Sequence, residues 1–156
     1  MYFSKKIYRN GSTFPIISDK KIVFTNGCFD ILHPGHLHYL YKAKSYGDIL
    51  IVALNSDSSI KRLKGSKRPV NDFEFRSTML SYLNFVDLII EFDSDTPLEL
   101  IKKVSPNVLV KGADYSESQV VGADFVKSNG GQIVLIEFLK GFSTTGIIKL
   151  IKKATS

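Results

Sequence analysis

The sequence predicts a single α/β domain with a Rossmann-like, doubly wound and mainly parallel sheet of five strands. From residue 21 onward, short apolar runs alternate with helical stretches, as they do where helices connect parallel strands. The apolar runs are continuous rather than interrupted by polar residues, which indicates strands buried on both faces. The chain has 156 residues, of which 44% are hydrophobic and 23% charged. This composition suits one soluble domain with a sizeable core.

Five strands and five helices are expected. The strands are predicted at Ile22–Thr25, Ile49–Leu54, Leu88–Phe92, Val108–Val110 and Ile133–Phe138. The helices are predicted at Gly35–Tyr46, Asp72–Leu83, Pro97–Val104, Asp124–Ser128 and Thr144–Ala154. Gly47 follows the first helix, Thr96 precedes the third as its N-cap, and Gly130 ends the fourth. Residues 1–20 have weak periodicity and are expected to form a loosely packed or partly disordered extension of the domain at 21–156.

Composition excludes some classes of function and leaves others open. The formal net charge of +6 favours anionic partners such as nucleic acid, a membrane surface or phosphorylated metabolites. No apolar run approaches the ~20 residues of a membrane span, and the start of the chain carries no secretory signal. Cys28, the one cysteine, cannot form an internal disulfide. We therefore expect a cytoplasmic protein.

A phosphate site is predicted where the first strand of the domain meets its first helix. Gly27 follows the strand and allows a turn whose backbone N–H groups approach a phosphate. Pro34 fits the first position of a helix, which puts His33 and His36 beside the free N–H groups of its first turn. His38 raises the alternative of a zinc site, but it points to another face of the helix, so a shared metal ion is geometrically poor.

These residues resemble the HxGH signature of the cytidylyltransferase-like nucleotidyltransferases. The signature is contained in the segment Asn26-Gly27-Cys28-Phe29-Asp30-Ile31-Leu32-His33-Pro34-Gly35-His36. Further motifs of the family follow at the expected spacing: Asn55-Ser56-Asp57, Arg68-Pro69-Val70-Asn71, Lys111-Gly112-Ala113-Asp114 and Gly141-Phe142-Ser143-Thr144-Thr145. Together they are most similar to the D-glycero-β-D-manno-heptose 1-phosphate adenylyltransferases, which occur alone or as half of a bifunctional kinase–adenylyltransferase.

The resemblance implies a nucleotidyltransferase domain at 21–156 that moves AMP from ATP to heptose 1-phosphate, giving ADP-heptose and pyrophosphate. It implies His33, His36 and Lys64 as catalytic residues. The nucleotide-binding residues it implies are Asn26, Gly27, Cys28, Phe29, Arg76, Gly112, Asp114, Ser143, Thr144 and Thr145. Mg²⁺ is expected to accompany the triphosphate, without metal ligands from the protein. ATP and a phosphorylated sugar are the expected partners, together with a second copy of the chain in a homo-oligomer, and neither nucleic acid nor a membrane is expected.

The segment from Lys61 to Arg68 contains five cations in eight residues. A solvated loop and a contact with nucleic acid are both compatible with such a run. The resemblance instead implies a flexible cationic flap over the triphosphate, with Lys64 as its catalytic lysine and Lys61 as the alternative.

One departure from a related branch bears on the choice of nucleotide. Glycerol-3-phosphate cytidylyltransferases carry Arg-Thr-Glu-Gly where this chain has Phe138-Leu139-Lys140-Gly141, and their arginine contacts the nucleotide. The heptose branch also has phenylalanine at the first position, so the likeness favours adenine over cytosine. A cytidylyltransferase acting on a small phosphorylated alcohol, such as glycerol 3-phosphate, is the alternative function.

Overall fold

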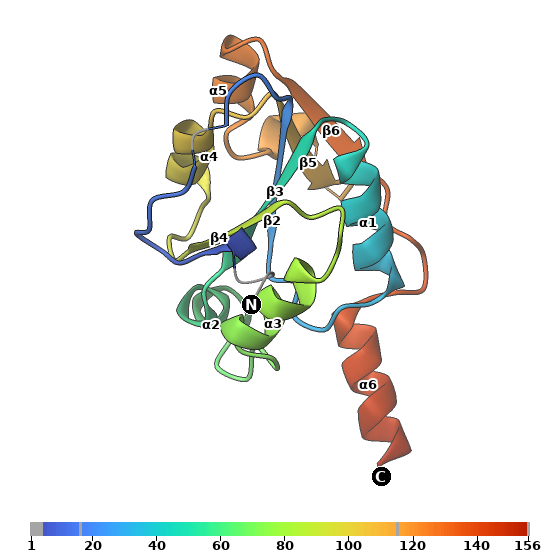
Figure 1. Cartoon of the computed structure of the whole chain (residues 1–156). Helices are drawn as coiled ribbons and strands as arrows, with labels where there is room; N and C mark the ends of the chain where they lie inside the picture. Colours follow the sequence, from blue (N-terminus) through green and yellow to red (C-terminus); the bar gives the residue numbers. More distant parts are fainter. Residues whose placement is uncertain (1–4, 16, 115, 156) are drawn as a thin grey trace.

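Six parallel strands form one sheet in the order β1-β4-β3-β2-β5-β6. The computed structural model describes residues 5–15, 17–114 and 116–155 (Figure 1). The strands are β1 (Ile7–Tyr8), β2 (Ile22–Gly27), β3 (Ile49–Asn55), β4 (Leu88–Phe92), β5 (Val108–Gly112) and β6 (Gln132–Ile136). The helices are α1 (Pro34–Lys44), α2 (Asp57–Lys64), α3 (Phe73–Ser81), α4 (Leu98–Val104), α5 (Ala123–Ser128) and α6 (Thr144–Ala154), with the 3₁₀ turn η2 (Glu117–Gln119).

The fold class is confirmed, but the sheet has one strand more than the five predicted. The additional strand, β1, pairs with the edge strand β4 through Ile7 and Tyr8. It lies within the segment predicted as an extension, of which residues 1–4 and 16 fall outside the described residues. Two residues are too short for an alternating or continuous apolar pattern. Pairing with the sheet, rather than sequence pattern, therefore makes this segment a strand.

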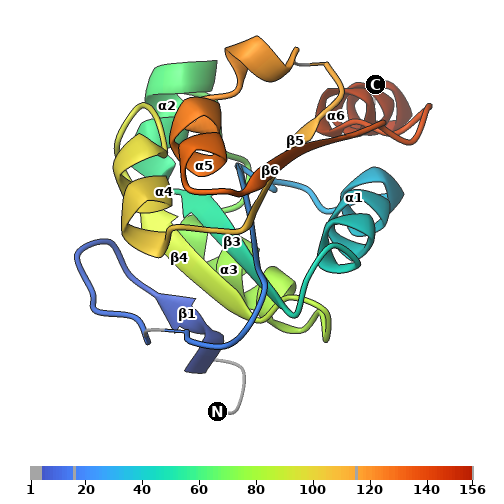
Figure 2. The ribbon, with the colours of Figure 1, turned by 90° about the horizontal axis from the view of Figure 1, so that it is seen from above.

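Helices cover both faces of the sheet (Figure 2). In β2, Val23 belongs to a core packed under α1 and α3, whereas its neighbour Phe24 belongs to a second core under α4 and α5. Leu50 and Ile51 in β3 divide in the same way. Because successive side chains of a strand point to opposite faces, a continuous apolar strand supplies both cores. Among the described residues, no helix combines the length and apolar character needed to cross a membrane.

The strand order reverses between β2 and β5, and the two strands part at this point. Their pairing joins Val23 to Val108 and Phe24 to Leu109. The pairing of β2 with β3, by contrast, continues to Gly27. The carboxyl ends of β2 and β5 therefore diverge and open a crevice, which is where ligands bind in doubly wound sheets.

Candidate active site at the switch point of the sheet

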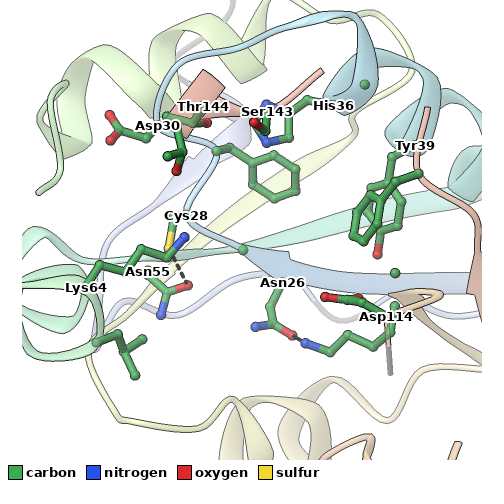
Figure 3. A pocket seen from close by; sticks show the side chains of 18 of the residues that line it. Asn26, Cys28, Asp30, His36, Tyr39, Asn55, Lys64, Asp114, Ser143 and Thr144 are labelled. Atoms are coloured by element: carbon green, nitrogen blue, oxygen red, sulfur yellow. Dashed lines mark hydrogen bonds between the residues drawn. The ribbon is translucent and has the colours of Figure 1, made fainter. Parts of the chain in front are cut away.

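A cleft of about 1150 Å³ opens between the carboxyl ends of β2 and β5. Asn26 and Gly27 enter it from β2, and Lys111 and Gly112 enter it from β5. The turn that follows β2, the end of α2 and the segment between β6 and α6 supply further walls (Figure 3). The position of this cleft makes it the candidate active site.

The turn after β2 brings backbone groups into the cleft. Phe29 has a left-handed φ of 43°, a conformation that costs a non-glycine residue about 1 kcal/mol or more. Its ring folds back over Gly27, where an added Cβ would lie 2.9 Å from a ring carbon. Gly27 therefore makes this turn possible by leaving room for the phenylalanine ring. Cys28, between the two, also lines the cleft.

His33 is the N-cap of α1, and Pro34 begins the helix as predicted. Nδ1 of His33 accepts a hydrogen bond from the backbone N–H of His36 at 3.3 Å. The two imidazoles stack, with ring centroids 3.8 Å apart and 17° between their planes. The ring of Phe29 contacts His36 edge-on at 5.2 Å. The capping bond and the ring contacts thus fix both histidines beside the helix N-terminus.

Burial keeps both histidines neutral at pH 7. It lowers the pKa of His36 to about 4, with a further contribution from the charge of His33. Burial also lowers the pKa of His33. Because Nδ1 of His33 accepts a hydrogen bond, we assign the proton of its neutral ring to Nε2. Such a ring can donate a hydrogen bond to a phosphate oxygen.

The first half of the cationic segment is helical, whereas a loop was expected there. α2 continues to Lys64, and Gly65 ends it with a φ of 91°. The helix was not predicted because a run of cations is also typical of a solvated loop. In the structure Ser56 caps the helix by accepting a hydrogen bond from Ser59 N–H at 3.0 Å. Lys64, the predicted catalytic lysine, lines the cleft, while the alternative Lys61 does not.

Two arginines of the same segment are held by carboxylates. Arg62 contacts Asp95 at 3.1 Å and Asp93 at 3.5 Å, which ties α2 to the turn after β4. Arg68 contacts the buried carboxylate of Asp30 at 2.7 Å. Hydrogen bonds from two backbone N–H groups and from Arg68 lower the pKa of Asp30, although its burial acts in the opposite direction. These contacts fix both ends of the segment that carries Lys64.

Arg76 does not line the cleft, although it was predicted to bind nucleotide. Its side chain is fully buried in α3. The guanidinium donates to the backbone carbonyls of Cys28 at 2.7 Å and Asn55 at 2.8 Å, and to the carboxylate of Asp57 at 2.7 Å. In this structure Arg76 supports the floor of the cleft from below.

The opposite wall comes from the end of β5 and the segment between β6 and α6. A Cβ added at Gly112 would overlap the ring of Phe138, so the absence of a side chain lets this half-exposed ring lie over the strand end. Ser143 caps α6 by accepting a hydrogen bond from Gly146 N–H at 3.0 Å. Ser143 and Thr144 face the cleft together with the α1 turn (Figure 3). A second helix N-terminus thus borders the same cleft.

Residues 24–149 match the model of the cytidylyltransferase-like family. The chain belongs to this family. The match extends from the middle of β2 into α6, and thus contains every segment that lines the cleft. In this cytidylyltransferase-like chain, all the predicted site residues except Arg76 border one cavity.

Curated relatives are similar over most of the chain. The "Bifunctional protein HldE" of Campylobacter concisus is 59% identical over 135 residues, which are 86% of this chain and 28% of the relative. The protein of the same name from Helicobacter hepaticus is 53% identical over 98% of this chain and 32% of the relative. The chain thus spans about a third of the length of the curated relatives that it matches.

A solved structure has the same fold. The crystal structure of "the lipopolysaccharide core biosynthesis protein from Thermoplasma volcanium GSS1" superposes with a TM-score of 0.64 and 28% sequence identity. The alignment covers 79% of this chain and 99% of that one.

Some residues of the cleft were not assigned a role from the sequence. Lys111 and Asp30 stand inside the family motifs but carried no prediction, and Tyr39 was not singled out. The Tyr39 hydroxyl forms a buried 2.8 Å hydrogen bond with Thr25 Oγ1. The position of Lys111 at the end of a predicted strand was the available signal. No group of three His, Cys, Asp or Glu side chains in the described part of the chain is arranged to hold a metal ion.

Proposed function

We propose that the chain is an adenylyltransferase that transfers AMP from ATP to D-glycero-β-D-manno-heptose 1-phosphate. A phosphate oxygen of the sugar attacks the α-phosphorus of ATP, the bond from the α-phosphorus to the bridging oxygen breaks, and pyrophosphate leaves. The main support is the convergence of His33, His36 and Lys64 with the N-termini of two helices on one cleft. The similarity to HldE proteins and the heptose-branch motifs support the choice of substrates.

The cleft is suited to this reaction because the nucleophile is already an anion and requires no strong base. The protein has to align two phosphate compounds and stabilise the charge that develops on them. We assign hydrogen bonds to the triphosphate to His33 and His36, and charge stabilisation on its phosphates to Lys64. The backbone at Cys28 and the hydroxyls of Ser143 and Thr144 would contact the nucleotide.

The residues of the cleft fit a Mg²⁺ ion that arrives on the triphosphate. Both carboxylate oxygens of Asp30 already accept hydrogen bonds, from Arg68, Val70 and Asn71. Mg²⁺ keeps water and phosphate oxygens as its main ligands and needs few from the protein. The ion would supply neutralisation of phosphate charge, while the side chains of the cleft bind and orient the substrates.

The apolar wall favours adenine as the base. Phe138 is 55% exposed although it borders the cleft, and Leu139 and Phe142 are also exposed there. An exposed aromatic ring can stack on a purine, and the wall lacks the arginine of the cytidylyltransferases that use glycerol 3-phosphate. We therefore propose ATP as the nucleotide. By likeness to the HldE proteins we also propose a cytoplasmic location, use of the product in lipopolysaccharide core synthesis, and assembly as a homo-oligomer.

Pyrophosphate release tests the reaction and both substrates. ATP, CTP, GTP and UTP are each supplied with Mg²⁺ and either heptose 1-phosphate or glycerol 3-phosphate. We expect release with ATP and heptose 1-phosphate alone. His33→Ala and His36→Ala should each lower turnover by ~10²-fold, the effect of removing one donor that stabilises developing charge.

Other outcomes would revise separate parts of the proposal. Release with CTP and glycerol 3-phosphate would replace both substrates and leave the reaction class intact. Unchanged turnover in both folded histidine variants would refute the assigned roles. Absence of pyrophosphate release with every pair of nucleotide and acceptor would refute the proposed function.

A further inference from the structure

Lys111 bridges the crevice at the point where the sheet opens. β2 and β5 pair at Phe24 and Leu109, and the strands diverge beyond these residues. Two residues further along each strand, Nζ of Lys111 on β5 donates a hydrogen bond to Oδ1 of Asn26 on β2. A side-chain contact therefore replaces the backbone ladder on the floor of the cleft, and both residues line that cleft.

The ammonium group is held in an environment that disfavours its charge. Burial lowers the pKa of Lys111 to about 8, and the negative charge of Asp114 only partly opposes this effect. A neutral ligand group, such as a ribose hydroxyl, would bring no charge to offset the desolvation. A phosphate in the crevice would bring a negative charge and favour the protonated amine.

Lys111 and the other residues that we assign to phosphate binding in the cleft come from different elements. His33 and His36 belong to the start of α1, and Lys64 belongs to the end of α2. Lys111 belongs to β5, on the other side of the point where the strand order reverses. A transfer between a nucleoside triphosphate and a sugar phosphate brings two phosphate-bearing compounds into one cleft. The groups on α1 and α2 suit one set of phosphates, and Lys111 is in a position to contact another.

We propose that Lys111 is a substrate-binding residue whose ammonium, oriented by Asn26 across the opened strands, donates to a phosphate oxygen of the bound ligand. The phosphate belongs to the nucleotide or to the sugar phosphate, and this identity rests on the proposed function. Asn26 is then a positioning residue that keeps the ammonium in the crevice. The competing explanation is that the Lys111–Asn26 bond only ties two strand ends together.

Binding of separate ligands, measured by calorimetry on the full chain, distinguishes these explanations. The proteins are the wild type, Lys111→Met, Lys111→Arg and, as a matched control, Lys42→Met, which replaces an exposed lysine on α1 outside the cleft. The probes are ATP with Mg²⁺, pyrophosphate, heptose 1-phosphate and adenosine. We expect Lys111→Met to weaken binding of at least one phosphate probe by about tenfold or more, as for loss of one hydrogen bond to a charged group.

The pattern across the probes identifies the source of the phosphate. Weaker binding of ATP and pyrophosphate with unchanged adenosine binding assigns Lys111 to the nucleotide. Weaker binding of heptose 1-phosphate alone assigns it to the sugar phosphate. Lys111→Arg should stay within about threefold of the wild type because it keeps the charge, and Lys42→Met should not differ. Unchanged binding of every phosphate probe by folded Lys111→Met would overturn the proposal.

The pH dependence gives a readout that a purely structural tie would not change. Because protonated Lys111 binds the anion, wild-type affinity for the sensitive probe should fall as pH rises through about 8 to 9.5. In Lys111→Arg this decline should disappear, because arginine stays charged throughout. Other titratable groups lie nearby: Asp114 acts on Lys111 directly, and Cys28 and Lys64 line the same cleft. Because the wild type and Lys111→Arg both contain these three groups, a difference between their pH profiles belongs to position 111. A decline that persists unchanged in Lys111→Arg would overturn the proposal.

The two measurements separate this inference from the proposed function. Thermal unfolding checks the fold of Lys111→Met. If this variant does not fold, the pH dependence of affinity in Lys111→Arg and in the wild type still distinguishes the two explanations. A wild type that binds ATP but releases no pyrophosphate with any acceptor would refute the proposed function. The comparison of binding would then still test whether Lys111 contacts a phosphate.

Discussion

The two histidines at the start of α1 lose their charge because the fold buries them. In the unfolded chain a histidine titrates near pH 6.5, whereas the pKa of His36 in the folded protein is about 4. Between these values the unfolded chain binds more protons than the folded one. The folded state therefore loses stability as the pH falls through this window and keeps it above pH 6.5.

Titration of His36 should lower the free energy of unfolding by about 2 kcal/mol between pH 7 and pH 5. His36→Ala removes this contribution, so its stability should depend less steeply on pH over the same range. Urea denaturation at pH 7, 6 and 5 measures the difference. His38→Ala, exposed on the same helix, is the control and should follow the wild type. Parallel pH profiles for His36→Ala and the wild type would contradict the prediction.

Lys64 and Lys67 are close in the sequence but differ in position relative to the cleft. Lys64 lines it at the end of α2, whereas Lys67 lies outside. We expect Lys64→Ala to reduce kcat by ~10²-fold, through loss of charge stabilisation on the phosphates. Lys67→Ala should change kcat by less than about threefold. Steady-state kinetics with ATP tests both, and the reverse order would show that the catalytic lysine has been misassigned.

At the scale of elements, α3 supports the cleft through one side chain. Arg76 connects the turn after β2, the end of β3 and the start of α2 through Cys28, Asn55 and Asp57. A fourth bond, to the carbonyl of Asn71 at 3.0 Å, ties it to the segment before α3. Without the guanidinium, the buried carbonyls would lose their donors and Asp57 its charge partner.

Arg76→Met should therefore lower the free energy of unfolding by about 3–5 kcal/mol, the typical cost of removing one partner from a buried charged network. Arg76→Lys should recover only part of this loss, since one ammonium cannot reach four acceptors in the geometry of a guanidinium. Chemical denaturation measures both variants. Lys102→Met, which removes an exposed ion pair to Glu99 within α4, serves as control and should cost no more than about 1 kcal/mol.

A different result for Arg76 would favour the role that the resemblance implied. If Arg76→Met kept wild-type stability and instead lost affinity for ATP, the arginine would contact the nucleotide directly. The stability and binding measurements on one preparation separate the two roles.

At the scale of the molecule, the cleft joins segments from distant parts of the chain. The turn after β2 supplies one side, and the segment leading into α6, more than 100 residues later in the numbering, supplies the other. α6 itself has no buried residue and extends away from the sheet (Figure 1). The core therefore depends little on α6, whereas the cleft depends on its N-terminus.

A chain that ends at Gly141 should keep the fold and bind the nucleotide more weakly. It lacks Ser143, Thr144 and Thr145, so we expect affinity for ATP to fall by about tenfold or more, while the midpoint of thermal unfolding shifts by only a few degrees. A chain that ends at Ile151 retains the helix N-terminus and should bind ATP as the full chain does. Thermal unfolding and calorimetry compare the three proteins. Full affinity for ATP in the chain that ends at Gly141 would exclude α6 from the site.

Local patterns along the chain predicted most of the fold and most of the lining of the cleft. Continuous apolar runs identified five strands, because a strand buried on both faces has no polar side to interrupt it. Pro34 located the start of α1, and Gly47 and Gly130 lie shortly after the ends of α1 and α5. The predicted cap Thr96 is wrong, because Pro97 is the N-cap of α4 and no side chain caps that helix. The HxGH segment and the later motifs identified residues that the fold brings to one cavity. These features depend on residues close together in the sequence, so the sequence by itself determined them.

Contacts between distant segments decided the rest. β1 is a strand because Ile7 and Tyr8 pair with β4. Arg76 lies outside the cleft because its guanidinium binds backbone carbonyls from separate segments of the folded chain. Lys111 meets Asn26 because β2 and β5 are neighbours that diverge. Hydrogen-bond partners and desolvation depend on which segments become neighbours, so only the tertiary structure determined the charge of His36 and the surroundings of Lys111.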